Sequence, residues 1–229
     1  MELFTHDAAL PGRRQRGGGR IQTPLGNIIT SFWLYDEEMP PASGGDEVRL
    51  ANGAVIQRWE ESAGDFEVLQ TSVVPPLPPP MRVQECRAVL WRFVPSRRTG
   101  PFLYRAYWQP GYVWLTGVPE PGPRLDGQTW TDGQTTVSMG TEGADALAFR
   151  ASQGEMLPMR LAEDLWSKGQ SRVMWDDESL FVAMPELEAG ELCQLQSVVA
   201  WGPAGEAGVA SWFALDISPH QILDAAGCQ

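Results

Sequence analysis

The stretch from residue 171 to residue 202, SRVMWDDESLFVAMPELEAGELCQLQSVVAWG, carries three apolar runs, divided first by an acidic turn and then by a turn that contains Gly190. The runs are short, rich in β-branched and aromatic residues, and bounded by turn-forming residues. These properties are typical of strands and not of helices. We therefore expect sheet here, with strands over 173–175, 180–183 and 192–201.

The same pattern extends over the rest of the chain. Two strands are expected around a turn at 24–27, and further strands over 65–74, 83–94, 102–108, 112–117 and 135–139, with turns at 126–127 and 132–133. The Asn52-Gly53 dipeptide is a strong hairpin signal, but we interpret it as a plain surface turn. Segment 83–94 is apolar on both faces, which predicts a central strand covered on both sides.

Only two segments favour a helix. One is 156–167, where Pro158 would set the start, and the other is 218–226, where Ser218 could cap a helix that begins at Pro219. Turns recur every 8 to 12 residues or so, the spacing of a sandwich. The sequence predicts an all-β fold, a large antiparallel β-sandwich or supersandwich with few short helices.

Composition and length predict one main domain. The chain has 229 residues, of which 43% are hydrophobic, enough for a sizeable core. Residues 12–20 form an arginine-glycine run that can bury nothing. We expect a flexible N-terminal segment over 1–20, a β-sandwich domain over 21–217 and a C-terminal tail with a short helix over 218–229.

Charge and cysteine content limit the partners. The net charge is −12 and the isoelectric point is about 4.6, which argues against nucleic acid or an anionic membrane as the main partner. No apolar run is long enough for a membrane span, and no secretory signal is present, so we expect a cytoplasmic protein. The three cysteines show no zinc spacing. We expect Cys86 and Cys193 to be buried, Cys228 to be exposed, and no metal or cofactor to be required.

No catalytic motif of a hydrolase triad, zinc protease, dinucleotide-binding or nucleotide-hydrolysing site is present. Acids beside aromatic rings are the remaining candidates, because a ring can stack on a sugar and a carboxylate can accept its hydroxyls. Adjacent acids on a strand point to opposite faces, so the run at 176–178 is also explained as a solvated turn. The remaining tryptophans fit a core. The candidate ligand-binding residues are Trp59, Glu60, Glu67, Trp130, Trp175, Asp176 and Asp177, and no catalytic residue is assigned.

The block PELEAGE at 185–191, the apolar strand 192–201 and the Gly205-Glu206-Ala207 segment together resemble the late strand of the galactose-mutarotase-like β-supersandwich. Domains of this type precede the (α/α)6 barrel in some glycoside hydrolases, sugar phosphorylases and glycogen-debranching-type enzymes. The resemblance implies this fold over about residues 20–217 and a carbohydrate partner. It implies no catalytic residue, because in those enzymes the acids belong to the barrel. Stand-alone mutarotases use histidines within the sandwich, and His6 and His220 lie near the two ends of this sequence.

Three functions remain open. The leading hypothesis is a non-catalytic, carbohydrate-associated domain that binds glycan or serves as an accessory or interaction module. The second is a sugar-active enzyme, an epimerase or glycoside hydrolase, with carboxylates among Glu60, Glu67, Asp176 and Asp177. The third is a structural protein that assembles through exposed sheet edges into a homo-oligomer or with a larger partner protein.

Overall fold

A computed structural model describes residues 9–10, 19–35, 37–39, 46–122, 124–168, 172–205 and 208–228. These ranges contain fifteen strands and four helices. The strands are β1 (Ala9–Leu10), β2 (Arg20–Thr23), β3 (Gly26–Leu34), β4 (Glu37–Met39), β5 (Asp46–Leu50), β6 (Val55–Glu61), β7 (Gly64–Ser72), β8 (Glu85–Pro95), β9 (Phe102–Trp108), β10 (Thr116–Pro121), β11 (Leu125–Thr131), β12 (Thr135–Glu142), β13 (Val173–Trp175), β14 (Ser179–Met184) and β15 (Cys193–Pro203). The helices are α1 (Ala144–Ser152), α2 (Met159–Lys168), α3 (Gly208–Phe213) and α4 (Pro219–Ala226).

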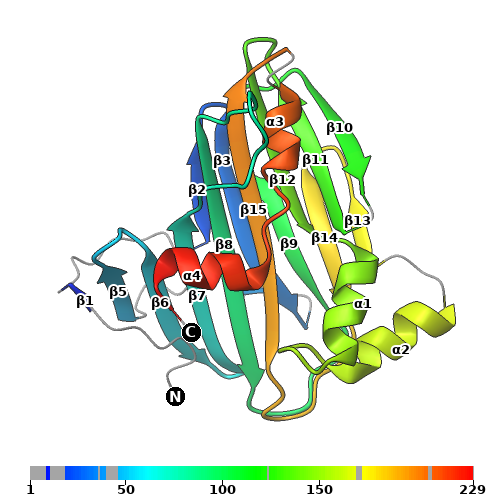
Figure 1. Cartoon of the computed structure of the whole chain (residues 1–229). Helices are drawn as coiled ribbons and strands as arrows, with labels where there is room; N and C mark the ends of the chain where they lie inside the picture. Colours follow the sequence, from blue (N-terminus) through cyan, green and yellow to red (C-terminus); the bar gives the residue numbers. More distant parts are fainter. Residues whose placement is uncertain are drawn as a thin grey trace.

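The strands form two antiparallel sheets packed face to face (Figure 1). The larger sheet has nine strands in the order β1-β5-β6-β7-β8-β15-β12-β11-β10. The smaller has the order β13-β14-β9-β3-β2, with β4 paired to β3. The predicted all-β antiparallel sandwich with few short helices is confirmed.

The stretch at 171–202 contributes to both sheets. Its first two runs are β13 and β14, a hairpin at the edge of the smaller sheet, in the register Val173↔Val182. Its third run, β15, lies in the middle of the larger sheet, between β8 and β12. All ten residues from Cys193 to Gly202 are buried. Residues 185–192 therefore carry the chain from one sheet to the other.

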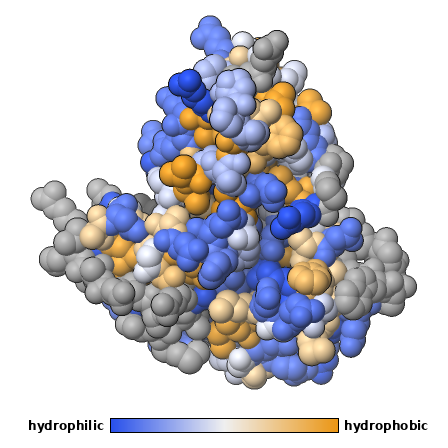
Figure 2. Space-filling model, viewed as in Figure 1, coloured by the Kyte–Doolittle hydropathy of each residue, from blue (hydrophilic) through white to orange (hydrophobic). Residues whose placement is uncertain are grey.

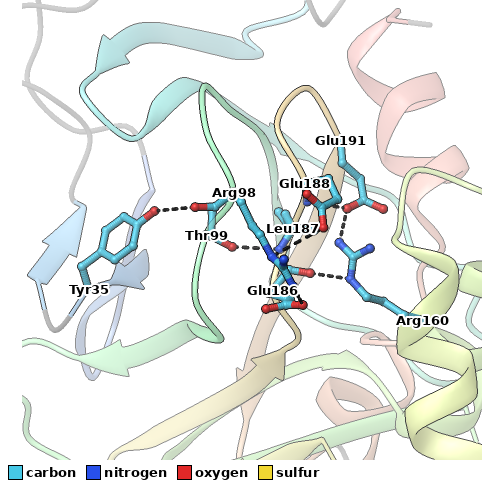
Figure 3. Close-up of polar contacts among 8 residues, drawn as sticks. All are labelled: Tyr35, Arg98, Thr99, Arg160, Glu186, Leu187, Glu188 and Glu191. Atoms are coloured by element: carbon cyan, nitrogen blue, oxygen red, sulfur yellow. Dashed lines mark hydrogen bonds and ion pairs between the residues drawn. The ribbon is translucent and has the colours of Figure 1, made fainter.

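Polar contacts hold this crossing segment in place (Figure 3). Thr99, in the β8–β9 connection, donates its N–H to the Leu187 carbonyl at 2.9 Å, and the Leu187 N–H donates to Thr99 Oγ1 at 2.8 Å. Arg160 of α2 donates to the Glu186 carbonyl at 2.6 Å and pairs with the Glu191 carboxylate. The PELEAGE block thus joins the two sheets to α2.

Both faces of the larger sheet are covered. Val89, Trp91 and Phe93 of β8 belong to the core between the two sheets. Ala88 and Leu90, which alternate with them, belong to a second core on the outer face. The prediction that segment 83–94 forms a central strand covered on both sides is confirmed.

Residues 208–228 cover part of the outer face (Figure 1). Leu215 and Ile222 are fully buried against the sheet. The predicted helix at 218–226 is present and begins as expected, since the Ser218 hydroxyl accepts from the Gln221 N–H and Pro219 occupies the first turn. Figure 2 shows the same face, on which hydrophilic residues predominate between the positions of α4 and α1.

Several expectations need correction. The strand predicted over 112–117 begins only at Thr116, since the Val113 N–H donates to the Leu25 carbonyl in a turn and the Leu115 N–H to the Thr131 carbonyl at the end of β11. Asp126-Gly127 is not a turn but part of β11, and helices α1 and α3 were not foreseen. Cys86 and Cys193 are buried as expected, but Cys228, expected to be exposed, is only 5% exposed and packs in the outer core.

The remaining expectations concern one turn, the N-terminal segment and membrane spans. Asn52-Gly53, interpreted from the sequence as a plain surface turn, is instead the turn of the β5–β6 hairpin, with Gly53 at φ 88°. Most of the segment 1–20, expected to be flexible, lies outside the described residues. Within the described ranges, none of the helices is long and apolar enough to span a bilayer.

Gly127 tests the packing of α3 on the larger sheet. A Cβ at this position would lie 2.7 Å from a ring carbon of Trp212 and 2.9 Å from the Met139 carbonyl. We expect Gly127→Ala to reduce the free energy of unfolding by about 1–3 kcal/mol, as overpacking does. Gly100→Ala is the control, because nothing lies within 4 Å of its added Cβ. Urea denaturation measures the free energy of unfolding of both variants. A Gly127→Ala variant as stable as Gly100→Ala would contradict this packing.

Candidate functional site

Two of the predicted ligand-binding residues are buried tryptophans. Trp59 is 7% exposed and stacks on Phe66 at 5.4 Å between ring centroids. Trp130 is fully buried, packs edge-on against Trp108, and donates its indole N–H to the Asp177 carbonyl at 3.0 Å. Neither ring, as it stands, offers an open face to a sugar.

The predicted acids of β6 and β7 lie on the outer face of the larger sheet. Glu60 is exposed near the end of β6. Glu67 is 1% exposed and forms an ion pair with Arg58, which lies directly opposite it in the register of β6 and β7. Glu67 is therefore a buried, charge-balanced group, and Glu60 a solvated one.

The other three candidates lie at the β13–β14 turn. Trp175 is half-buried, and Asp176 and Asp177 are exposed. The Asp176 carboxylate accepts the Glu178 N–H at 2.9 Å, which closes the turn. The Asp177 carbonyl accepts the Trp130 indole N–H, so Trp130 lies beside this turn. The strands β13 and β6, in contrast, belong to different sheets and lie on opposite sides of the molecule (Figure 1). The candidates therefore form two separate groups.

A row of polar side chains crosses the outer face of the larger sheet. Arg58, Glu67, Arg92 and Gln194 face one another on four successive strands, β6, β7, β8 and β15. Arg92 is 2% exposed and donates to the Gln194 side-chain oxygen at 2.7 Å. Burial lowers the pKa of Arg92, and the Glu67 carboxylate acts in the opposite direction.

The row leads to a buried ion pair between β12 and α1. Two nitrogens of Arg150 donate hydrogen bonds to the Glu142 carboxylate, at 2.9 and 2.8 Å, and Arg150 also donates to the Gln194 carbonyl at 2.9 Å. Burial raises the pKa of Glu142, and the Arg150 guanidinium partly offsets this. Two-point contact fixes the orientation of the carboxylate.

Above this pair lies a cavity of about 730 Å³. Its floor includes Glu142, Arg150 and Gln194, and α4 supplies a wall through His220 and Leu223. The opposite wall comes from α1 and the loop after it. There Phe149 is 65% exposed and Met156 is 38% exposed. The volume falls in the usual range of small-ligand sites, about 300–1,000 Å³.

Met156 is held in an unusual conformation at the edge of this cavity. Its φ is +54°, a region that side-chain-bearing residues rarely occupy. Its carbonyl accepts the Gln194 N–H at 2.8 Å, and its sulfur lies 3.5 Å from an Arg92 nitrogen. Strained residues that the surroundings hold in place are concentrated at functional sites.

The charges of the cavity nearly cancel. Arg124 and Arg150 stand against Glu142, Asp145 and Glu155, and the chain as a whole carries −12. An anionic ligand is therefore disfavoured. Within the part of the chain that the structure describes, no group of three His, Cys, Asp or Glu side chains could hold a metal ion.

Sequence reasoning missed this site for an identifiable reason. Glu142 and Arg150 are separated by the start of a helix that apolar periodicity did not indicate, and Gln194 lies in a strand that was noted only for its apolar residues. One signal was present. An isolated arginine on the buried face of a predicted central strand, such as Arg92, requires an acidic or polar partner on neighbouring strands.

Comparisons with known proteins found a structural similarity and no sequence match. No family model matches the sequence, and no curated protein matches it. A solved structure described as "Putative kojibiose phosphorylase from human microbiome" is similar to this chain, at 8% sequence identity and a TM-score of 0.46. The match covers 98% of this chain, which spans 28% of the length of that one. A match at this level carries no argument about the fold or the function of this chain, so the sandwich assignment rests on the two packed sheets and no residue role is transferred.

The Glu142–Arg150 pair gives a pH-dependent prediction. Arg150→Met leaves a buried carboxylate without its guanidinium, which costs about 3–5 kcal/mol of the free energy of unfolding near pH 7. Since the pKa of Glu142 is raised in the folded chain, and rises further without Arg150, the folded state holds this proton more tightly than the unfolded state. The loss should therefore be smallest in acid and grow as the pH rises through that pKa.

Urea denaturation between pH 4 and 7 measures this dependence. Arg98→Met is the control, because Arg98 and Glu186 form an ion pair that is largely solvated, with 59% and 40% of their side chains exposed. Arg98→Met should lower the free energy of unfolding much less, and its loss should not increase as the pH rises. A stability loss for Arg150→Met that is independent of pH would contradict the assignment to Glu142.

Proposed function

We propose that this chain is a non-catalytic carbohydrate-binding domain and that the cavity between α1 and α4 binds a short neutral glycan. The observation that carries the proposal is the combination of an oriented buried carboxylate on the floor and an exposed aromatic ring on the wall. Glu142 presents acceptor oxygens to sugar hydroxyls, and the Phe149 ring can cover an apolar sugar face.

Charge supports a neutral ligand. Arg150, one of the cationic groups at the cavity, already forms a two-point ion pair with Glu142. A phosphate or carboxylate would meet Asp145 and Glu155 at the rim. A sugar hydroxyl can both donate and accept a hydrogen bond, so a neutral sugar can bind to acidic and basic side chains alike.

The same geometry argues for binding and against hydrolysis or epimerisation. A general acid must release a proton to the substrate, and a general base must be free to take one. Glu142 is tied at both oxygens by Arg150. Trp59 and Trp130, two candidate ligand-binding residues from the sequence, do not line this cavity.

Two other proposals from the sequence stay open. The group formed by Trp175, Asp176 and Asp177 is an alternative binding place, because Trp175 is half-buried beside two exposed acids. Assembly through sheet edges has less support at β10, where Pro119 and Pro121 lack the N–H groups that an added strand would need.

Replacement of Phe149 tests the proposal. Calorimetric titration with glucose, galactose, maltose, cellobiose and lactose should detect binding of at least one sugar to the unmodified chain. Phe149→Ala should weaken that binding about tenfold or more, because a buried aromatic contact of roughly 1.5–3 kcal/mol is lost. Phe149→Trp should retain it.

Phe213→Ala is the matched control, since Phe213 is also an exposed phenylalanine, 49% accessible, but lies on α3 away from this cavity. Amide shifts in nuclear magnetic resonance spectra should be confined to residues 142–156, 194 and 218–223. Absence of binding to every sugar would refute the proposal. Binding that is lost in Trp175→Ala and kept in Phe149→Ala would move the site to the acidic turn.

A further inference from the structure

Another cavity, of about 590 Å³, lies between α3 and the strands β10, β11 and β12 of the larger sheet (Figure 1). Glu120, Thr129 and Thr136 line it on the sheet side. Val209 and Phe213 of α3 line the other side, and each is 49% exposed. Its volume falls within the usual range of small-ligand sites, about 300–1,000 Å³. It shares no lining residue with the cavity between α1 and α4.

The Trp212 ring of α3 lies on the sheet beside Glu120. Glu120 stands directly opposite Gly127 of β11, so their Cβ positions are on the same face of the sheet. A Cβ on Gly127 would lie 2.7 Å from a Trp212 ring carbon, and a Cβ on Gly122 would lie 3.5 Å from another. The ring therefore occupies the space that two glycines leave next to Glu120. Both Trp212 and Glu120 are half-buried, and both line the cavity.

A chain of hydroxyl groups holds the Glu120 carboxylate in place. The Thr129 hydroxyl donates to Glu120 Oε2 at 3.1 Å, because an ionised carboxylate can only accept. Thr129 has no second hydrogen, so Ser138 donates to Thr129 at 2.9 Å, and Ser211 of α3 donates to Ser138 at 2.7 Å. These bonds fix one carboxylate oxygen. The other, Oε1, has no hydrogen-bond or ion-pair partner within the described part of the chain.

The charge of this cavity selects the class of ligand. Among the described residues that line it, Glu120 is the one ionisable group, and the chain as a whole carries −12, so an anion is disfavoured. A calcium or magnesium ion needs several oxygen ligands, and the described residues place no second carboxylate here. An organic cation needs fewer polar partners, because aromatic rings attract its charge and apolar side chains contact its alkyl groups.

We infer that the cavity between α3 and β10 binds a small alkylammonium ion. The positive charge lies beside the Glu120 carboxylate and against the Trp212 and Phe213 rings, and the alkyl groups contact Val209. Because the hydroxyl chain fixes Glu120 before the ligand arrives, binding requires little rearrangement. The site is separate from the one proposed for a glycan and does not depend on it.

Titration of the unmodified chain with choline and with n-butylammonium tests the inference, followed by amide shifts in nuclear magnetic resonance spectra. At least one of the two cations should shift amides confined to residues 118–120, 129, 136 and 209–213. The tert-butyl analogue of choline, in which carbon replaces the charged nitrogen, has nearly the same shape. It should bind about tenfold more weakly than choline, because it lacks both the ion pair and the cation–π contact. Sodium chloride at the same ionic strength should not reproduce the shifts.

Two pairs of variants locate the charge and the ring. Glu120→Gln keeps an oxygen that can accept from Thr129 but removes the charge, and it should weaken cation binding about threefold or more. Glu60→Gln is the matched control, because Glu60 is an exposed glutamate on β6 of the same sheet. Phe213→Ala should weaken binding by a similar factor, about threefold. Phe149→Ala, which alters the other cavity, should leave it unchanged.

Four results would overturn the inference. The first is the absence of shifts with both cations. The second is equal affinity for choline and its neutral analogue, since the cavity would then select shape and not charge. The third is an equal loss in Glu120→Gln and Glu60→Gln, which would assign the attraction to the net charge of the chain. The fourth is a shift of these amides by a sugar and by neither cation. Each would leave the proposed glycan site between α1 and α4 to its own test.

Discussion

The burial of β8 and β15 on both faces is the constraint on which the rest of the structure depends. These two strands are paired at the centre of the larger sheet, and their side chains are apolar on the inner face and largely apolar on the outer one. The smaller sheet covers the inner face. The outer face needs a second cover, which residues 208–228 provide through Leu215, Ile222 and their neighbours. A sandwich with only two layers would leave this face open to water.

The cavity between α1 and α4 lies where that second cover ends. Beyond α4 the outer face carries Arg92, Gln194 and Glu142 in place of apolar residues, and each is satisfied by a neighbour on an adjacent strand or on α1. Such groups tolerate burial only as pairs. The pairing has a further effect, since groups held by one another cannot rearrange freely, and a ligand meets acceptors whose directions are already fixed.

The sequence predicted those features that local pattern determines. Strand 83–94 with its two apolar faces, the strands at 171–202 and the Ser218-Pro219 helix start all depend on residues close together in the chain. The cavity depends on contacts that local pattern does not show, such as Arg92 with Gln194 far along the chain and Glu142 with Arg150 across a strand-to-helix junction. Trp130 and Gly127 show a related difficulty. Polar neighbours suggested an exposed ring and a turn, but the packing of Asp177 and Trp212 against β11 overrides them.

The position of β15 also governs how the larger sheet is completed. Its two neighbours, β8 at 85–95 and β12 at 135–142, come earlier in the chain, and each has an unpaired edge until Cys193–Pro203 inserts between them. Pairings over such long sequence separations form slowly. Until the insertion is made, two apolar strand edges are available to other chains, which is the situation in which proteins aggregate. We therefore expect the centre of this sheet to form late in folding, and its strand edges to be open to aggregation until it does.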